Sequence, residues 1–241
     1  MAMFASRSPG WSLPAGYRPG RLLLVAIMFL IVGGCESDRE ELEASNRCVW
    51  CRLNGADLAG VDLTGATLWM TFLERADLQG AVLKGANINR VKFTGANLSR
   101  ADLSGADARK TVFTHADLSG ADLSDANLSE AFLEEAKLSG AKLDGATMLI
   151  TIMHRADFTG ASLVSANARQ ALGRETVFAG ADLSGADLGW AVLVGADFRQ
   201  ANLSGADLEG ADLTGADFTG AIWTDASPCY SASCDERAYA D

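Results

Sequence analysis

The sequence predicts an all-β solenoid, in which short units stack along one axis. The prediction starts from five pentapeptides at residues 196–220, which read ADFRQ-ANLSG-ADLEG-ADLTG-ADFTG without a gap. A period of five matches neither the 3.6-residue period of a helix nor the two-residue period of a strand. Units this short can bury their apolar residue only against neighbouring units, so the stacking of repeats is itself the fold.

The same register extends far beyond this run. Central residues recur every five positions from Leu58 to Trp223, which makes 34 repeats without an insertion, and 21 of these centres are Leu. The pattern A(D/N)LXX resembles that of the pentapeptide repeat proteins over about residues 51–226. This resemblance implies a right-handed quadrilateral β-helix with four repeats per coil. At ~4.8 Å between stacked coils, about 8–9 coils give a rod roughly 40 Å long.

Each position of the repeat suits such a coil. The central residue and the Ala two positions before it are expected to point inward, because only a small residue leaves room in a narrow core. Asp, Asn, Ser and Thr are expected to face solvent, and Gly at the last position permits the positive φ of a tight turn. Two other repeat folds lack their motifs here, since the sequence has neither the GGxGxD of calcium-binding β-rolls nor a Gly at every third position.

A predicted export signal precedes the repeats. Residues 22–34 read LLLVAIMFLIVGG, an apolar run that is too short to cross a bilayer and has the length of a signal-peptide core. The sequence VGGC at its end resembles a bacterial lipobox, which implies that Cys35 becomes the lipidated first residue of the mature protein. We therefore expect a signal peptide at residues 1–34 and a membrane-anchored lipoprotein facing the periplasm or the cell exterior. The alternative is an ordinary signal and a secreted protein.

Composition divides the rest of the chain into three segments. Residues 35–47 are acidic and polar, and are expected to form a solvated tether or a short frayed helix. Residues 48–226 are expected to form the β-helix, and residues 227–241 a C-terminal tail. The formal net charge is −11, and the first 34 residues hold three Arg and no acidic residue, so the remainder is more acidic still. An acidic surface repels phosphates, so direct nucleic-acid binding is not expected.

Positions 20 residues apart stack in a four-repeat coil, so the repeats sort into four faces. On the first face (centres 58 to 218) and the second face (centres 63 to 223), the last repeat position is Gly in 13 of 18 cases. On the third face (centres 68 to 208) it is Gly only once in eight, at Gly210. We therefore expect the turns at the corner after the third face to proceed without a positive φ.

The fourth face (centres 73 to 213) differs in its outward residues. The position before the centre is apolar in six of eight repeats, whereas the other faces carry mostly polar residues there. Stacked side chains of this kind predict an outward apolar stripe that contacts a protein partner or a second copy of the chain. The alternatives are that the stripe reflects only strand propensity, or that the termini cover it. The predicted surface, with two residues of the adjoining corner, comprises Phe72, Val112, Phe132, Ile152, Leu172, Val192, Trp69 and Trp190.

The cysteines favour structural roles. Cys229 and Cys234 are expected to close a disulfide loop in the tail after export. Cys48 and Cys51 form either a disulfide or a pair of buried thiols. Because the two pairs lie at opposite ends of a rod of roughly 40 Å, one chain cannot use all four for a zinc site.

These residues predict a non-enzymatic scaffold that contacts other proteins. His115 and His154, the only histidines, are expected on the surface and outside any catalytic arrangement, and no metal or cofactor is predicted. The family resemblance implies one alternative, because some pentapeptide repeat proteins resemble B-DNA in width and charge and bind DNA gyrase. Gyrase is cytoplasmic, however, so a protein exported as expected here would not meet it.

Overall fold

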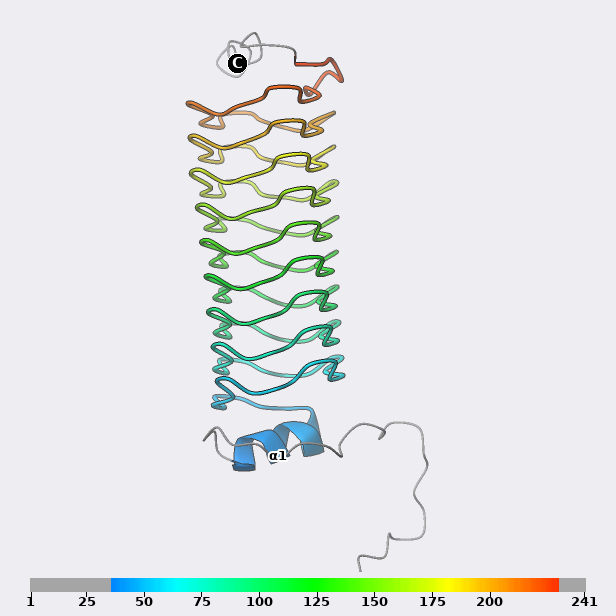
Figure 1. Cartoon of the computed structure of the whole chain (residues 1–241), viewed down its shortest axis with the longest axis vertical. Helices are drawn as coiled ribbons and strands as arrows, with labels where there is room; N and C mark the ends of the chain where they lie inside the picture. The colour runs from blue at the N-terminus through cyan, green and yellow to red at the C-terminus, as the bar shows by residue number, and fades with distance from the viewer. Residues whose placement is uncertain (1–35, 230–241) are drawn as a thin grey trace, which may run out of the picture. The chain divides into compact units, whose positions relative to one another are not determined.

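The computed structural model describes residues 36–229, which form helix α1 (Glu36–Ser45) followed by a right-handed quadrilateral β-helix (Figure 1). This fold confirms the predicted class. The strands are reduced to single bridging residues, each paired in parallel with the residue 20 positions later. The ladder runs from the Arg47–Thr67 pair to the Asn202–Ile222 pair, so one coil contains four repeats and the rod has about nine coils.

The repeat at residues 101–105 shows how the backbone is satisfied. Asp102 donates its N–H to the preceding coil (2.9 Å), and Leu103 and Gly105 donate theirs to the following coil (2.7 and 2.8 Å). The N–H of Ala101 closes the turn from the previous repeat (3.0 Å). The N–H of Ser104 donates to the Asp102 carboxylate (2.9 Å), which explains why Asp or Asn recurs before the centre. All five donors of the repeat are therefore paired.

Central residues and small residues fill the interior, as the sequence predicts. Leu128, for example, is fully buried, and burial of one Leu side chain contributes about 2 kcal/mol. Along the first face, aromatic centres stack directly on one another at centroid separations of 5.0–5.1 Å, and an indole closes the stack edge-on: Phe158, Phe178, Phe198, Phe218 and Trp223. The few buried Thr residues donate their hydroxyls to carbonyls of the preceding coil, as Thr111 does at 2.6 Å. Within residues 36–229, no buried side-chain nitrogen or oxygen lacks a partner.

The expectation for the corner after the third face was wrong. Its turn residues have a positive φ although most are not Gly, with values of 57° at Met70, 55° at Ile150 and 60° at Trp190. The N–H that follows each of them bonds back to the central carbonyl, as Thr71 does to Leu68 (3.0 Å), and this closes the same turn as on the Gly-rich faces. A β-turn of this kind requires a positive φ at its third residue. The ladder therefore imposes the turn geometry, and the residue preference is overridden.

Helix α1 caps the N-terminal end, where the sequence predicted a solvated tether or a short frayed helix. Leu42 is buried (3% exposed) against the core. The Asp38 carboxylate accepts the backbone N–H of Arg52 (2.9 Å), and the Asp38 carbonyl oxygen lies 3.1 Å from the Cys48 Sγ. These contacts attach the helix to the first coil. One large apolar residue, Leu42, in a mostly polar helix was too weak a signal for a cap.

The C-terminal end folds back on the last coil. Ile222 and Pro228 form an antiparallel bridge, and Trp223 donates its N–H to the carbonyl of Ser227 (2.7 Å). Gly220 donates its N–H to the carbonyl of Cys229 (2.8 Å). The rest of the predicted tail lies outside the described residues. No helix within residues 36–229 is long and apolar enough to cross a membrane.

Candidate functional site

The residues of the predicted apolar stripe lie in one row along the fourth face. Parallel bridges join consecutive members through the whole rod, with Lys92 inserted after the first member and Asp212 following the last. All six apolar side chains are half-buried, because each stacks on its neighbours while its outer edge faces solvent. We call these residues the apolar stripe: Phe72, Val112, Phe132, Ile152, Leu172 and Val192.

The corner next to the stripe carries most of the exposed large apolar residues. Of the five such residues within 36–229, four lie on the turns that lead from the third face to the fourth, and only Ile222 lies elsewhere. We call this the apolar corner, and its residues with their exposed fractions are Trp50 (58%), Trp69 (36%), Ile150 (49%) and Trp190 (54%). The sequence analysis missed Trp50, because the repeats were counted from Leu58. Counting back 20 residues from Met70 would have found it.

Local geometry holds these side chains at the corner. Trp50 and Trp69 meet edge to face at 6.1 Å between ring centroids. Trp190 lies over Gly210, where a Cβ atom would come within 3.0 Å of the indole ring. A non-Gly residue with positive φ costs roughly 1–2 kcal/mol, and a β-branched residue such as Ile150 is the least suited to it. The corner therefore keeps exposed apolar residues at a cost in stability.

The stripe carries a similar cost. An apolar side chain before the centre cannot accept the N–H after the centre, as Asp102 does for Ser104. Each missing hydrogen bond is worth about 1 kcal/mol. Among residues 36–229, four N–H groups that follow stripe residues have no acceptor, whereas those of Glu74 and Arg174 bond to side chains of the preceding coil. The four belong to Thr114, Glu134, His154 and Val194. Folding alone therefore does not favour this sequence of outward residues.

Charged residues of both signs surround the stripe. The Lys92 ammonium lies 5.0 Å from the centroid of the Phe72 ring. Arg155 donates to Glu135 (2.7 Å), and this hydrogen bond holds the pKa of the Glu135 carboxyl below its usual range. On the third face, Arg109 likewise lowers the pKa of Asp107 through a charge-assisted hydrogen bond. An apolar strip with a mixed polar rim is the usual anatomy of a protein interface.

The cysteines within residues 36–229 are all disulfide-bonded. Cys48 and Cys51 are joined to each other, with 5.5 Å between their Cα atoms, and both are buried. Cys48 is the central residue of a repeat, so this pair belongs to the first coil. Cys229 is buried and disulfide-bonded, and its predicted partner Cys234 lies outside the described residues, as does Cys35.

The two histidines lie on the outside of the fourth face. His115 is exposed beside Glu135 (3.3 Å), and the Nδ1 of His154 accepts the N–H of Arg174 (3.1 Å). Within residues 36–229, no group of three or more His, Cys, Asp or Glu residues is arranged to hold a metal ion.

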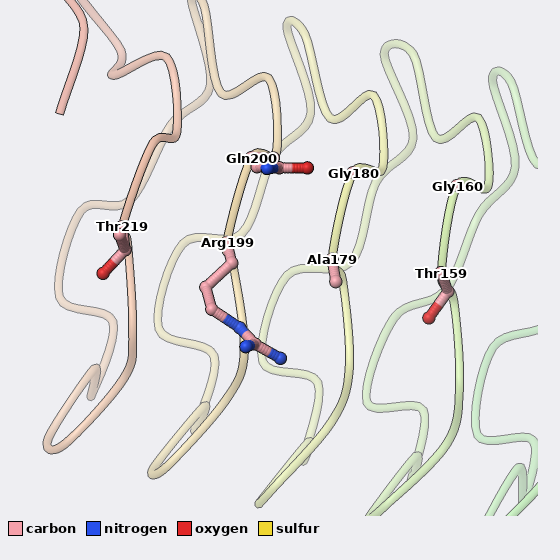
Figure 2. A pocket seen from close by; sticks show the side chains of 7 residues that line it. All are labelled: Thr159, Gly160, Ala179, Gly180, Arg199, Gln200 and Thr219. Atoms are coloured by element: carbon pink, nitrogen blue, oxygen red, sulfur yellow. The ribbon is translucent and has the colours of Figure 1, made fainter. Parts of the chain in front are cut away.

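The surface hollow in Figure 2 lies at the corner after the first face, on four consecutive coils. It has a volume of about 490 Å³, and it exists because three of its lining residues are Gly or Ala. Its one charged residue, Arg199, already pairs with Asp197 at 2.6 Å. That hydrogen bond also lowers the pKa of Asp197. The hollow is open and holds no reactive group.

Known proteins share this repeat. A family model described as Pentapeptide repeats matches the chain in 8 copies, with matches at residues 47–80, 56–95, 76–114, 116–148, 151–189 and 181–220. No match was found among the curated proteins.

Several solved structures are similar. One is HetL, a pentapeptide repeat protein involved in regulating heterocyst differentiation in the cyanobacterium Nostoc sp. strain PCC 7120. It is 30% identical, and the match covers 79% of this chain and 97% of HetL with a TM-score of 0.49. Full-length QnrB1, a plasmid-mediated fluoroquinolone resistance protein, is 22% identical over 68% of this chain and 90% of QnrB1 (TM-score 0.40). Rfr23 from Cyanothece 51142 is 22% identical over 78% and 97% (TM-score 0.28). The chain belongs to the pentapeptide repeat family.

Proposed function

We propose that this protein is a non-enzymatic scaffold of the cell envelope, anchored through a lipidated Cys35, whose apolar stripe makes protein–protein contacts. The single observation that carries the proposal is the stripe itself. Apolar side chains lie in one row along the fourth face, at a repeat position where the other faces mostly carry Asp or Asn.

Two further observations support a contact role over simple strand propensity. The stripe gives up hydrogen bonds that Asp or Asn would make, and the neighbouring corner places Ile150 and Trp190 in turns that suit Gly better. Residues kept at a cost to stability are typical of functional surfaces. Among residues 36–229, neither terminus covers the stripe, because α1 caps the first coil and residues 222–229 fold over the last.

The alternative of a DNA-mimicking gyrase ligand fits this surface less well. A DNA mimic needs continuous negative charge, whereas the fourth face carries apolar residues together with Lys92, Arg155 and Arg174. QnrB1 shares the repeat at low identity, and its resistance role is a property of that protein. Fractionation of cells with labelled palmitate separates the two ideas. Label that is lost in Cys35→Ser supports the envelope protein, and unlabelled protein in the cytoplasm would restore the gyrase alternative.

The proposal that the stripe forms a homodimer is tested by measuring the molecular mass of the protein in solution. Detergent-solubilised wild type and a Phe132→Asp/Ile152→Asp variant are compared by light scattering, with the detergent contribution subtracted. We expect a dimer for the wild type and a monomer for the variant. A Val82→Asp/Val177→Asp variant also replaces apolar residues by Asp at the same repeat position, but on the second and first faces, so it serves as the control. A monomeric wild type, or an unchanged mass in the stripe variant, would rule out the homodimer.

A further inference from the structure

We propose that the N-terminal part of the apolar corner, formed by Trp50 and Trp69, is seated in the headgroup layer of the membrane that carries the anchor. The inference rests on the proposed lipidation of Cys35. It assigns Trp69 to the bilayer, whereas the stripe from Val112 onward remains the proposed protein contact. Two independent observations carry it, which are the position of the corner along the chain and its chemistry.

The first observation is that no flexible tether separates the anchor from the rod. Cys35 directly precedes α1, and Asp38, three residues further, bonds to Arg52 (2.9 Å) and lies against Cys48 (3.1 Å). Three residues span at most roughly 10 Å. Trp50 lies between these two contacts in the sequence, so lipid on Cys35 would bring the first coil to the bilayer surface.

The second observation is that this corner has the composition of a membrane-interface surface. Trp50 is the most exposed large apolar residue within 36–229, and its ring contacts that of Trp69. Indole rings favour the headgroup region, because one part of the ring is apolar and the N–H is polar. Arg47 and Arg52 are exposed on the two sides of Trp50, and neither forms an ion pair with any residue in 36–229. Unpaired guanidinium groups bind lipid phosphates.

Charge also determines which part of the first coil contacts the lipid. Helix α1 contains five acidic residues and one Arg, and Arg39 is paired with Glu43 (2.8 Å). Anionic headgroups repel such a helix, whereas they attract the corner between Arg47 and Arg52. Because α1 begins directly after Cys35, the helix stays near the anchor, and this repulsion is expected to tilt the rod so that the apolar corner, and not the acidic side chains of α1, contacts the headgroups.

Trp190 provides a matched control within the same molecule. It occupies the same corner, has a comparable exposure of 54% and shares the positive φ of Trp50. It lies seven coils further along the rod, at ~34 Å for stacked coils. If exposure alone decided membrane contact, Trp190 would behave like Trp50. If the anchor decides it, only Trp50 and Trp69 reach the lipid.

The test measures tryptophan quenching by doxyl-labelled lipids. The mature lipidated protein is reconstituted into vesicles of phosphatidylethanolamine and phosphatidylglycerol, with the quencher placed near the headgroup. Four tryptophans follow Cys35, so we expect quenching of about half of the emission. Trp190→Phe should keep this quenching, Trp50→Phe/Trp69→Phe should lose it, and Arg47→Glu/Arg52→Glu should reduce it. Circular dichroism of each variant verifies that the coil remains folded.

Two contrary results are distinguishable. Lipid-labelled protein whose quenching is absent, or disappears only in Trp190→Phe, would overturn the membrane contact and leave the anchored scaffold intact. Protein without lipid on Cys35 would overturn both the anchor and this contact. Neither result depends on the mass of the stripe variant, so the protein-contact role is judged separately.

Discussion

The first and fourth faces share one backbone but differ in their outward chemistry. On the first face, Asp117 and Leu118 donate to neighbouring coils at 2.9 and 2.7 Å, and on the fourth face Val112 and Phe113 do so at the same distances. Asp117 also accepts the N–H of Ser119 (3.0 Å), a bond that Val112 cannot make. The ladder therefore does not depend on the residue before the centre. That position is free to serve stability on one face and contact on another.

The largest expected effect on stability comes from substitutions in the core that the two faces share. Leu118 and Leu133 are both fully buried, one behind each face. Either residue changed to Ala should lower the free energy of unfolding by about 2–5 kcal/mol, because a cavity remains in a narrow core. Urea titration measures the loss. If the fourth-face change cost much less, the core would be looser behind the stripe, and the faces would differ inside as well as outside.

Acid should remove the stabilisation that the outward Asp residues contribute, on the first face and at the last repeat of the fourth face. The pKa of Asp197 is lowered by its hydrogen bond from Arg199, and that of Asp212 by hydrogen bonds from the hydroxyl and then the N–H of Thr214. A carboxyl whose folded pKa lies below its unfolded value near 3.8 stabilises the fold above that pH, and the contribution is lost as pH falls through the folded pKa. Thermal melting should therefore be steady from pH 7 to 5 and fall toward pH 3. A melting temperature that rises on acidification would contradict this.

Substituting the residue before the centre should have opposite effects on stability on the two faces. Asp117→Ala should cost about 1 kcal/mol, because the N–H of Ser119 loses its acceptor. Val112→Asp should raise the stability of the monomer by about 0.5–1 kcal/mol, because it supplies an acceptor for the N–H of Thr114. Denaturation is measured at a protein concentration where light scattering reports monomers. A destabilising Val112→Asp would mean that the stripe is present for folding and not for contact.

The smallest expected effect concerns the turns. Ile150→Gly should stabilise the protein by at most about 1 kcal/mol, because Gly accepts a positive φ and the gain is partly offset by chain entropy. Gly160→Ala makes the opposite change at a first-face turn with φ of 63° and open space around the Cβ position, and should destabilise by about 1 kcal/mol. Calorimetry measures the change in unfolding free energy for both variants. If both substitutions changed the unfolding free energy by the same amount in the same direction, the turns would not be under conformational strain.

Periodicity predicted a solenoid, because every repeat from Leu58 to Trp223 has the same inward and outward positions. The resemblance to the pentapeptide repeat proteins implied the coil of four repeats. Given four repeats per coil, the stripe followed from stacking, since residues 20 apart then lie on one face. Trp50 was missed although the same spacing reaches it, because its repeat departs from the pattern in its letters. Two other features were not predictable in this way. Leu42 is the one large apolar residue of a polar helix, and the φ of Ile150 is imposed by the coils above and below.

The central claim is that the fourth face touches another protein and the first face does not. A photo-crosslinking residue is placed at Phe132 on the stripe, or at Val177, which occupies the same repeat position on the first face. Irradiation of intact cells then captures whatever lies against each position. We predict one adduct of defined mass from position 132, of twice the protein mass if the partner is a second copy, and none from position 177. Identical adduct patterns at the two positions, or no adduct at position 132, would contradict the claim.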